Sequence, residues 1–482
     1  MRSGVGLRIC LTFRIGDILL LKTKQLAGIS LAALLLIVMS IIPGTETLSQ
    51  AGIKTICTLI AFIIMLTTAP FRILHICLIF LGLLPVLGVA PSFAAAITGI
   101  SNPVILFVIA SFGISAAFTT LPLSKRILVT LLHRFGKNIK LMLLGLMASI
   151  FVISGFVSSV PTCAVFMAIA LGFLELYDDP EDRKRTGRAF MIAVPVAAMV
   201  GAFMTPIGST LNLLALNELE KHTGLTIPFV QWMAAGVPIA VATLPVAWYC
   251  ILKIHKPAEI SAAMVNNFIK HLEIPEKLTR PEIITLIITG IMIIFWVASS
   301  WVSGINIMVV TLLGACALCI PQLKTLKFDA FVDDISWDSV FLIAAVISIG
   351  NLMVTNGVSG FIISIIPELN VSTPVFIALA TTAYFIMLIV IPVAPSLIVI
   401  IGAPLISLAI GAGSSPQLVM LVSAICSCCC FLLPLDTVQL LTYGKGYYSI
   451  RDMFVSSLPV QIFMILVISL WLPVIGRAFG MV

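Results

Sequence analysis

Apolar runs that are nearly free of charge, separated by short polar segments, dominate the chain. Those suited to one transmembrane helix each cover residues 25–43, 51–69, 73–91, 101–118, 229–252, 285–302 and 306–322. Because one bilayer crossing takes about 20 residues, this pattern predicts an all-α polytopic membrane protein. Basic residues among leucines and valines over 119–140 predict a helix that lies along the cytoplasmic surface.

One uncharged run is too long for a single crossing. It covers residues 141–174, and a straight helix of that length would be about 50 Å long, against a hydrocarbon core of about 30 Å. Ser158, Ser159, Pro161 and Thr162 stand near its middle, where proline removes an amide donor and hydroxyl groups can satisfy the freed backbone. We therefore expect a re-entrant hairpin with its tip at these residues and both ends facing the cytoplasm.

The next apolar run is interrupted between Gly201 and Asn212. Two glycines, a proline and several polar side chains stand there, and irregular backbone at membrane depth is tolerated only where it is buried in protein or lines a cavity. This pattern is typical of a discontinuous transporter helix. Ser209, Thr210 and Asn212 are candidate ligand-binding residues. Their alternative role is to satisfy the broken backbone or to hold helices together.

The second half of the chain repeats these features. WDSVFLIAAVISIGNLMVTNGVSGFI (337–362) aligns with NPVILFVIASFGISAAFTTLPLSKRI (102–127) at an offset of 235. A second uncharged run, 369–435, carries Pro395 and Ser396 where the first hairpin tip maps, and the segment after Pro434 parallels the one after Pro206 at an offset of 228. Two halves with the same order of span, hairpin and broken helix indicate an internal structural repeat.

Charge placement sets the expected orientation. With eleven spans and a cytoplasmic N-terminus, 24 of the 27 Lys and Arg residues fall inside, and Lys54, Lys221 and Arg477 fall outside. The C-terminus is then expected outside, and the protein is expected in the plasma (inner) membrane. Because the number of spans is odd, the two repeats are expected to have inverted topologies. The expected parts are 1–50 (basic segment and first span), 51–254 (repeat 1, inward hairpin 141–174), 255–284 (cytoplasmic loop) and 285–482 (repeat 2, outward hairpin 373–412).

Composition agrees with this assignment and excludes other classes. The chain has 482 residues, of which 60% are hydrophobic and 10% charged, and a mean hydropathy of +1.20, which argues against soluble enzymes and secreted disulfide scaffolds. The net charge of +7 is explained by topology, so no nucleic-acid partner is expected. The five histidines lack metal-ligand spacing and no glycine-rich phosphate loop is present, so we expect neither an enzyme nor a cofactor. Transport driven by an ion gradient is the function that these exclusions leave.

The expected half-helices suit an anion and a cation together. Their amide ends favour an anion, and their carbonyl ends and neighbouring hydroxyls favour a cation such as Na⁺. Asp436 follows 67 uncharged positions and is an ionisable group at membrane depth. It is a candidate to bind a cation or exchange a proton, and its alternative role is to cap a helix or pair with a basic residue such as Lys445.

Three segments resemble the divalent anion/sodium symporter family. They are SNPVILFVIASFGISAA, GAFMTPIGSTLNLLAL and TYGKGYYSIRDMF, and the resemblance covers most of the chain after residue 100. It implies about eleven transmembrane helices, inverted repeats with two re-entrant hairpins, and a homodimer whose transport domain moves like an elevator. The implied substrates are di- and tricarboxylates or sulfate, carried with Na⁺.

The hairpin tips depart from the family, whose tips typically read Ser-Asn-Thr. The matching tips here are Ser158-Ser159-Val160 and Ala394-Pro395-Ser396. The resemblance implies a first cation site at Ser154, Ser158 and the backbone around Gly201, and we add Asp436 as a replacement second cation or proton site. The candidate substrate-binding residues are Ser158, Ser159, Thr162, Ser209, Thr210, Asn212, Ser396 and Thr437.

The sequence thus predicts a secondary active transporter that imports an anion with Na⁺. A proton-coupled anion carrier or an anion exchanger is the alternative within transport. From a different class, a channel or a sensory membrane protein could share the scaffold. Paired hairpins and broken helices favour a carrier, since a channel has no need for two matched sites at mid-membrane.

Overall fold

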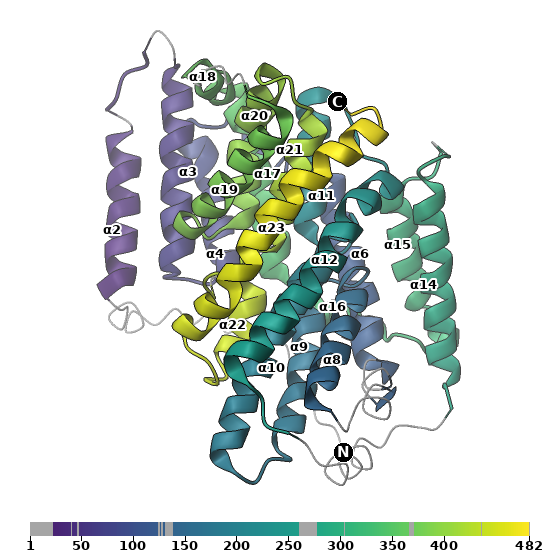
Figure 1. Cartoon of the computed structure of the whole chain (residues 1–482). Coiled ribbons are helices and arrows are strands. Elements are labelled where there is room, and N and C mark those ends of the chain that lie inside the picture. Colours follow the sequence, from purple (N-terminus) through teal and green to yellow (C-terminus); the bar gives the residue numbers. More distant parts are fainter. Residues whose placement is uncertain are drawn as a thin grey trace, which may run out of the picture.

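The computed structural model describes residues 23–39, 41–45, 48–123, 126, 129–130, 138–259, 277–302, 304–365, 371–434 and 436–481. Throughout these ranges the regular elements are helices, and they contain no strand (Figure 1). Eight of the helices are long and apolar enough to cross a membrane, and six shorter ones are apolar over 10–17 residues. The predicted fold class, an all-α polytopic membrane protein, is therefore confirmed.

The first half of the chain begins with α2 and ends with a long helix, α12. Its helices are α2 (Thr23–Val38), α3 (Gln50–Thr68), α4 (Ile73–Val86), α5 (Phe93–Ala96), α6 (Pro103–Thr120), α8 (Ile139–Ser154), α9 (Ser159–Leu174), α10 (Pro180–Ala202), α11 (Thr210–Thr223) and α12 (Phe229–His255). Polar side chains start several of them: Asn102 accepts from the Val104 amide and Asp179 from the Glu181 amide, each directly before a proline at the first helical position.

The second half presents a similar order of elements. Its helices are α14 (Arg280–Ala298), α15 (Ile307–Leu318), the 3₁₀ turn Pro321–Leu323, α16 (Phe328–Asp334), α17 (Trp337–Thr355), α18 (Val358–Ile365), α19 (Thr373–Val390), α20 (Ala394–Gly411), α21 (Pro416–Cys428), α22 (Thr437–Tyr443) and α23 (Ile450–Ala478). After α2, the longer helices α3, α4 and α6 correspond in order to α14, α15 and α17 of the second half. In each half a pair separated by a short break follows, then a second interrupted pair, then a helix of 27 or 29 residues.

Both overlong uncharged runs are interrupted near the expected tips. α8 and α9 are separated by residues 155–158, and α19 and α20 by residues 391–393. Half of the predicted surface helix over 119–140 lies outside the described residues, as do most of the basic segment 1–24 and residues 260–276 of the predicted loop.

The two interrupted pairs exchange partners across the molecule. α8 and α9 both pack against α10 of their own half, and α9 also packs against α22 of the other half. α19 and α20 both pack against α21 of their own half, and α20 also packs against α11 of the other half. α8 has a further contact with α12. In Figure 1, α8, α9, α10 and α22 accordingly lie in the lower half of the view, and α11, α20 and α21 in the upper half. The short second parts of both broken helices thus lie beside the pair from the opposite half of the chain.

Candidate functional site

The first broken helix is held together by a buried amide. α10 ends at Ala202 and α11 begins at Thr210, and the fully buried Asn212 spans the gap. Its Nδ2 donates to the Ala202 carbonyl at 2.9 Å and to the Thr205 carbonyl at 2.8 Å. The Ala202 carbonyl lies at the end of α10, where the helix supplies no amide partner, whereas the Thr205 carbonyl also accepts from the Gly208 amide at 3.3 Å. The position of Asn212 therefore fits the alternative role, that of holding helices together.

The second broken helix uses the same device. α21 ends at Cys428 and α22 begins at Thr437, and the fully buried Gln439 donates from Nε2 to the Phe431 carbonyl at 3.2 Å. Asn212 and Gln439 occupy equivalent positions, each three residues after the residue that caps its helix. Gln439 was not among the residues predicted from the sequence. An alignment of the two halves at an offset of 227 residues would have paired Asn212 with Gln439. The offset of 228 that the prolines indicate does not pair them.

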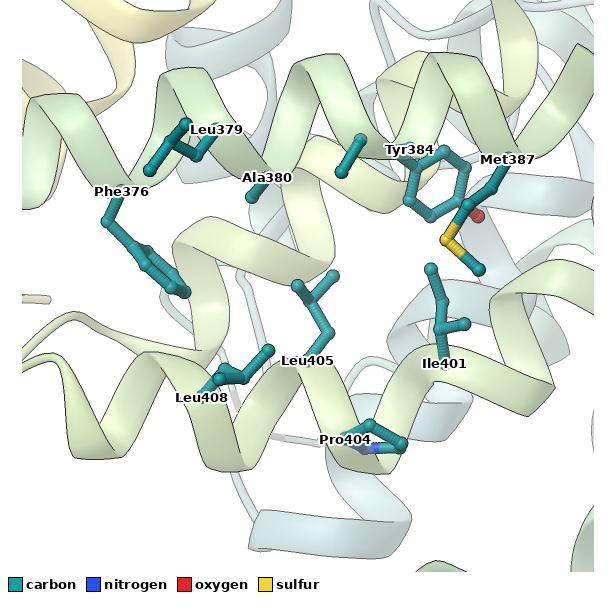
Figure 2. A pocket seen from close by; sticks show the side chains of 10 residues that line it. Phe376, Leu379, Ala380, Tyr384, Met387, Ile401, Pro404, Leu405 and Leu408 are labelled. Atoms are coloured by element: carbon teal, nitrogen blue, oxygen red, sulfur yellow. The ribbon is translucent and has the colours of Figure 1, made fainter. Parts of the chain in front are cut away.

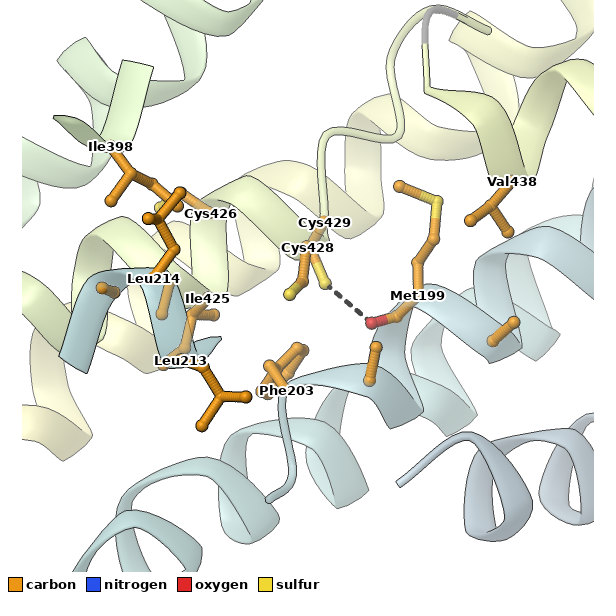
Figure 3. Close-up of a cluster of buried hydrophobic side chains, with 14 of the residues drawn as sticks. Met199, Phe203, Leu213, Leu214, Ile398, Ile425, Cys426, Cys428, Cys429 and Val438 are labelled. Carbon is orange, nitrogen blue, oxygen red and sulfur yellow. Dashed lines mark hydrogen bonds between the residues drawn. The ribbon is translucent and has the colours of Figure 1, made fainter. Parts of the chain in front are cut away.

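Thiol groups join the two broken helices. Cys428 Sγ donates to Asn212 Oδ1 at 3.3 Å, and Cys429 Sγ donates to the Met199 carbonyl at 3.4 Å. Figure 3 shows Cys428 and Cys429 between Met199 of α10 and Leu213 of α11, among buried apolar side chains. The ends of α10 and α21 therefore meet in the interior, so both breaks belong to one region of the protein.

The break between α8 and α9 lies directly against α10. Gly201 allows this approach, since a Cβ there would stand 2.3 Å from the Phe151 carbonyl oxygen. Ser154, fully buried, donates from Oγ to the Ala198 carbonyl at 2.6 Å. Thr205 donates from Oγ1 to the Gly155 carbonyl. This bond joins the segment between α10 and α11 to the segment between α8 and α9.

Backbone carbonyl oxygens converge where these two breaks meet. A Cβ built on Gly208 would lie 2.5 Å from the Ala202 oxygen and 3.0 Å from both the Gly155 and the Ser154 oxygens. Uncharged oxygens from helix ends and unwound backbone are the ligands that transporters use for Na⁺. The donor chemistry around Ser154, Gly201 and Gly208 thus fits a monovalent cation.

Helix starts supply the groups suited to an anion. Ser158 precedes α9 without making a side-chain cap, and both Ser158 and Ser159 are half-buried. Thr162 is buried and donates from Oγ1 to the Ser158 carbonyl at 3.0 Å. Cys163 Sγ donates to the Val438 carbonyl at 3.4 Å, so the N-terminal part of α9 lies beside the first turn of α22.

The start of α20 contains an unsatisfied hydroxyl group. Ser396 is fully buried in the first turn, and its Oγ has no hydrogen-bond partner among the residues that the structure describes. α20 packs against α11, where Ser209 Oγ accepts from the Leu211 amide at 3.2 Å and Thr210 is half-buried. Buried hydroxyls usually have partners, and five others among the described residues also lack one, so Ser396 is distinguished by its place in the first turn of α20 as well.

Asp436 caps α22. Its Oδ1 accepts from the Val438 amide at 2.8 Å, and its own amide donates to Gln439 Oε1 at 3.4 Å. This is the helix-capping role that the sequence left open, and none of the ion pairs between described residues joins Asp436 to Lys445. The carboxyl group is half-buried, and its helix, α22, packs against α9. Thr437, the first residue of α22, is exposed.

A separate cavity of about 250 Å³ lies between α19 and α20 (Figure 2). Its lining is almost entirely apolar and contains no charged residue. The lining residues are Phe376, Leu379, Ala380, Ala383, Tyr384, Met387, Ile401, Pro404, Leu405 and Leu408. A dianion would lose its hydration there without gaining polar partners. The anion site is therefore better sought at the helix starts than in this cavity.

Comparisons with known proteins agree with this architecture. The family model described as the sodium:sulfate symporter transmembrane region matches residues 23–482. The sodium-dependent dicarboxylate transporter SdcS of Staphylococcus saprophyticus is 22% identical over 94% of this chain and 92% of its own length. SdcS of Staphylococcus aureus strain MRSA252 is 21% identical with the same coverage, and a membrane protein of Cupriavidus necator is 23% identical over 68% of this chain and 67% of its own length.

A solved structure has a related fold. The YdaH transporter of Alcanivorax borkumensis superposes with a TM-score of 0.54 at 15% sequence identity, covering 80% of this chain and 86% of that one. This likeness concerns the fold alone. Because the family model matches nearly the whole chain, the protein belongs to the sodium:sulfate symporter family of membrane transporters.

Proposed function

We propose that this protein is a secondary active transporter that imports an anion together with Na⁺. The observation that carries the proposal is the meeting of two broken helices and two interrupted pairs, with carbonyl oxygens converging at Gly208 and the unsatisfied Ser396 hydroxyl at a helix start. Membership of a sodium:sulfate symporter family supports Na⁺ as the coupling ion, and the dicarboxylate transporters among the relatives support an anionic substrate.

In this mechanism the cation binds where the α8–α9 break contacts the first broken helix. The Ser154, Gly155 and Ala202 carbonyls surround Gly208 and would replace water around Na⁺. Ser158 and Gly201 contribute the helix break and the close approach of the two backbones. The bound positive charge then strengthens the anion site at the neighbouring helix starts.

The anion binds at the starts of α9, α11 and α20. Their first turns present backbone amides and the hydroxyls of five candidate residues: Ser158, Ser159, Ser209, Thr210 and Ser396. Neither tip offers an asparagine or a cationic side chain. The substrate class that fits is a di- or tricarboxylate, sulfate or a related anion, held mainly by dipoles and hydroxyls. Thr162 and Thr437 are included in this proposal as flanking hydroxyls.

We further propose that the two halves are inverted repeats and that α8–α9 and α19–α20 are re-entrant hairpins. The recurring order of elements and the exchange of partners between the halves support this assignment. Alternating access by elevator motion, a homodimer, and a plasma-membrane location with a cytoplasmic N-terminus and an outward C-terminus complete the proposal. Asp436 is the proposed second cation or proton site.

A thermal-shift experiment on the detergent-purified protein tests the binding step. The midpoint of unfolding is measured with succinate, citrate or sulfate, each in Na⁺ and in choline buffer. A ligand that binds only the folded state raises the midpoint, and occupancy at 100 times the Kd stabilises by about 2.7 kcal/mol. We expect at least one anion to stabilise the protein in Na⁺ only. Equal midpoints in both buffers with every anion would contradict the proposal.

A further inference from the structure

Three ionisable side chains lie together on the C-terminal part of α11, away from both breaks. Glu218 Oε2 is 3.2 Å from His222 Nε2, and Glu218 Oε1 is 3.9 Å from Lys221 Nζ. Spacings of three and four residues place the three side chains on one face of the helix. The Glu218 side chain is 1% exposed, that of His222 14% and that of Lys221 23%. A buried carboxylate therefore sits between two basic groups.

α20 packs against this cluster through Gly402, which has no side chain. A Cβ on Gly402 would lie 3.6 Å from Glu218 Cβ and 3.8 Å from Glu218 Oε2. Oε1 has no hydrogen-bond partner among the described residues, although it is fully buried. A carboxylate that is half-satisfied in a helix interface is costly to keep there. An ionisable group inside a membrane segment is a functional candidate by default.

Few other charges act on the cluster. α6, α20 and α21 pack against α11 and contain no Asp, Glu, Lys, Arg or His, and the titratable Cys428 of α21 contacts Asn212 instead. α17 approaches Lys221 at Gly350, and its Asp338 lies at the opposite end of that helix, 3.6 Å from Arg72. Cys426, the other thiol within α21, is buried. On α11 itself, Glu220 is exposed. The charge of the cluster is therefore governed by its own three side chains.

The cluster has one more base than it needs for neutrality. Lys221 alone balances the charge of Glu218, so a permanent ion pair does not require His222. Imidazole is the side chain whose ordinary titration range lies nearest to neutral pH, and the Glu218 carboxylate lies 3.2 Å from His222 Nε2. The carbonyl end of α11 favours positive charge at the same place. One proton can thus bind at a defined position without leaving a buried carboxylate unpaired.

We propose that Glu218 and His222 form a proton-binding site, distinct from the proposed anion and Na⁺ sites. This inference goes beyond the proposed function, because it places a proton at residues that the transport site does not use and that are separate from Asp436. α20 carries both Ser396 and Gly402, so the helix that contributes to the anion site also covers the proton site. Proton occupancy and substrate occupancy then act on the same helix.

Residue-level labelling of histidine tests the site without any substrate. Diethyl pyrocarbonate modifies neutral imidazole, so the rate at each histidine, followed by peptide mass spectrometry from pH 5 to 8.5, reports its protonation. The full chain in detergent is compared with E218Q and K221Q. His75, which is exposed on α4, serves as the internal control.

We expect the midpoint for His222 to fall by at least half a pH unit in E218Q, which is about a threefold loss of proton affinity. In K221Q it rises, because a competing positive charge has been removed. The His75 midpoint stays the same in all three proteins. A His222 midpoint unchanged in both variants, or a His222 that never reacts, would overturn the proposal. Since no transport is measured, a failure of the proposed function leaves this result interpretable.

Discussion

Replacing Asn212 by alanine tests whether this amide holds the broken helix together. The side chain is fully buried and makes two hydrogen bonds, of 2.9 and 2.8 Å, to the Ala202 and Thr205 carbonyls. Each such bond contributes about 1 kcal/mol net, and the Ala202 carbonyl, left buried without a partner, adds a desolvation cost, so the expected loss is about 2–4 kcal/mol. The free energy of unfolding is measured in dodecyl maltoside micelles titrated with sodium dodecyl sulfate.

Asn217 supplies the matched control, since it lies on the same helix. It is half-buried, and its Oδ1 accepts from Asn102 Nδ2 at 3.1 Å. N217A should cost under about 1 kcal/mol. If N212A is no less stable than N217A, yet loses stabilisation by anions, Asn212 acts on the substrate and the structural reading given above is refuted.

Three further substitutions probe other parts of the account. G201A should prevent close packing of α8 on α10, because the new Cβ would stand 2.3 Å from a carbonyl oxygen. In the control G290A the new Cβ meets no atom within 4 Å. The monodisperse yield in size-exclusion chromatography should therefore fall only in G201A. D436N keeps a good helix cap, so its stability should change by less than about 1 kcal/mol, while half-saturation by Na⁺ rises at least tenfold if the carboxylate binds the cation. E282A leaves Arg126, 2.6 Å away, without its buried carboxylate and should cost about 3 kcal/mol in thermal unfolding assays, with the double variant R126A/E282A regaining part of that loss.

The breaks in the helices could be predicted from sequence. The uncharged run 141–174 exceeds one membrane crossing, and prolines and glycines mark where the backbone must leave the helix. In the structure the helices are accordingly interrupted at residues 155–158, 203–209 and 391–393. These features are local, since they depend on length and on residues that cannot continue a helix.

The roles of individual side chains could not be predicted in the same way. Asn212 and Gln439 act through carbonyls that only the folded break brings within reach, and an error of one residue in the repeat offset concealed their equivalence. The sequence places Lys221 outside the membrane and gives His222 no metal-ligand spacing, so neither stands out as part of a site. Their partner Glu218 is buried where α20, nearly 200 residues later in the chain, packs against α11. Contacts of this kind depend on tertiary structure.

Uptake by the purified protein in proteoliposomes tests the central claim most directly. Labelled succinate and sulfate are supplied outside, with an inward Na⁺ gradient, with Na⁺ equal on both sides, or with choline in place of Na⁺. The account predicts saturable accumulation of at least one anion above its equilibrium level, only while the Na⁺ gradient persists. Accumulation that is equal in choline, or entry that never saturates, would contradict it.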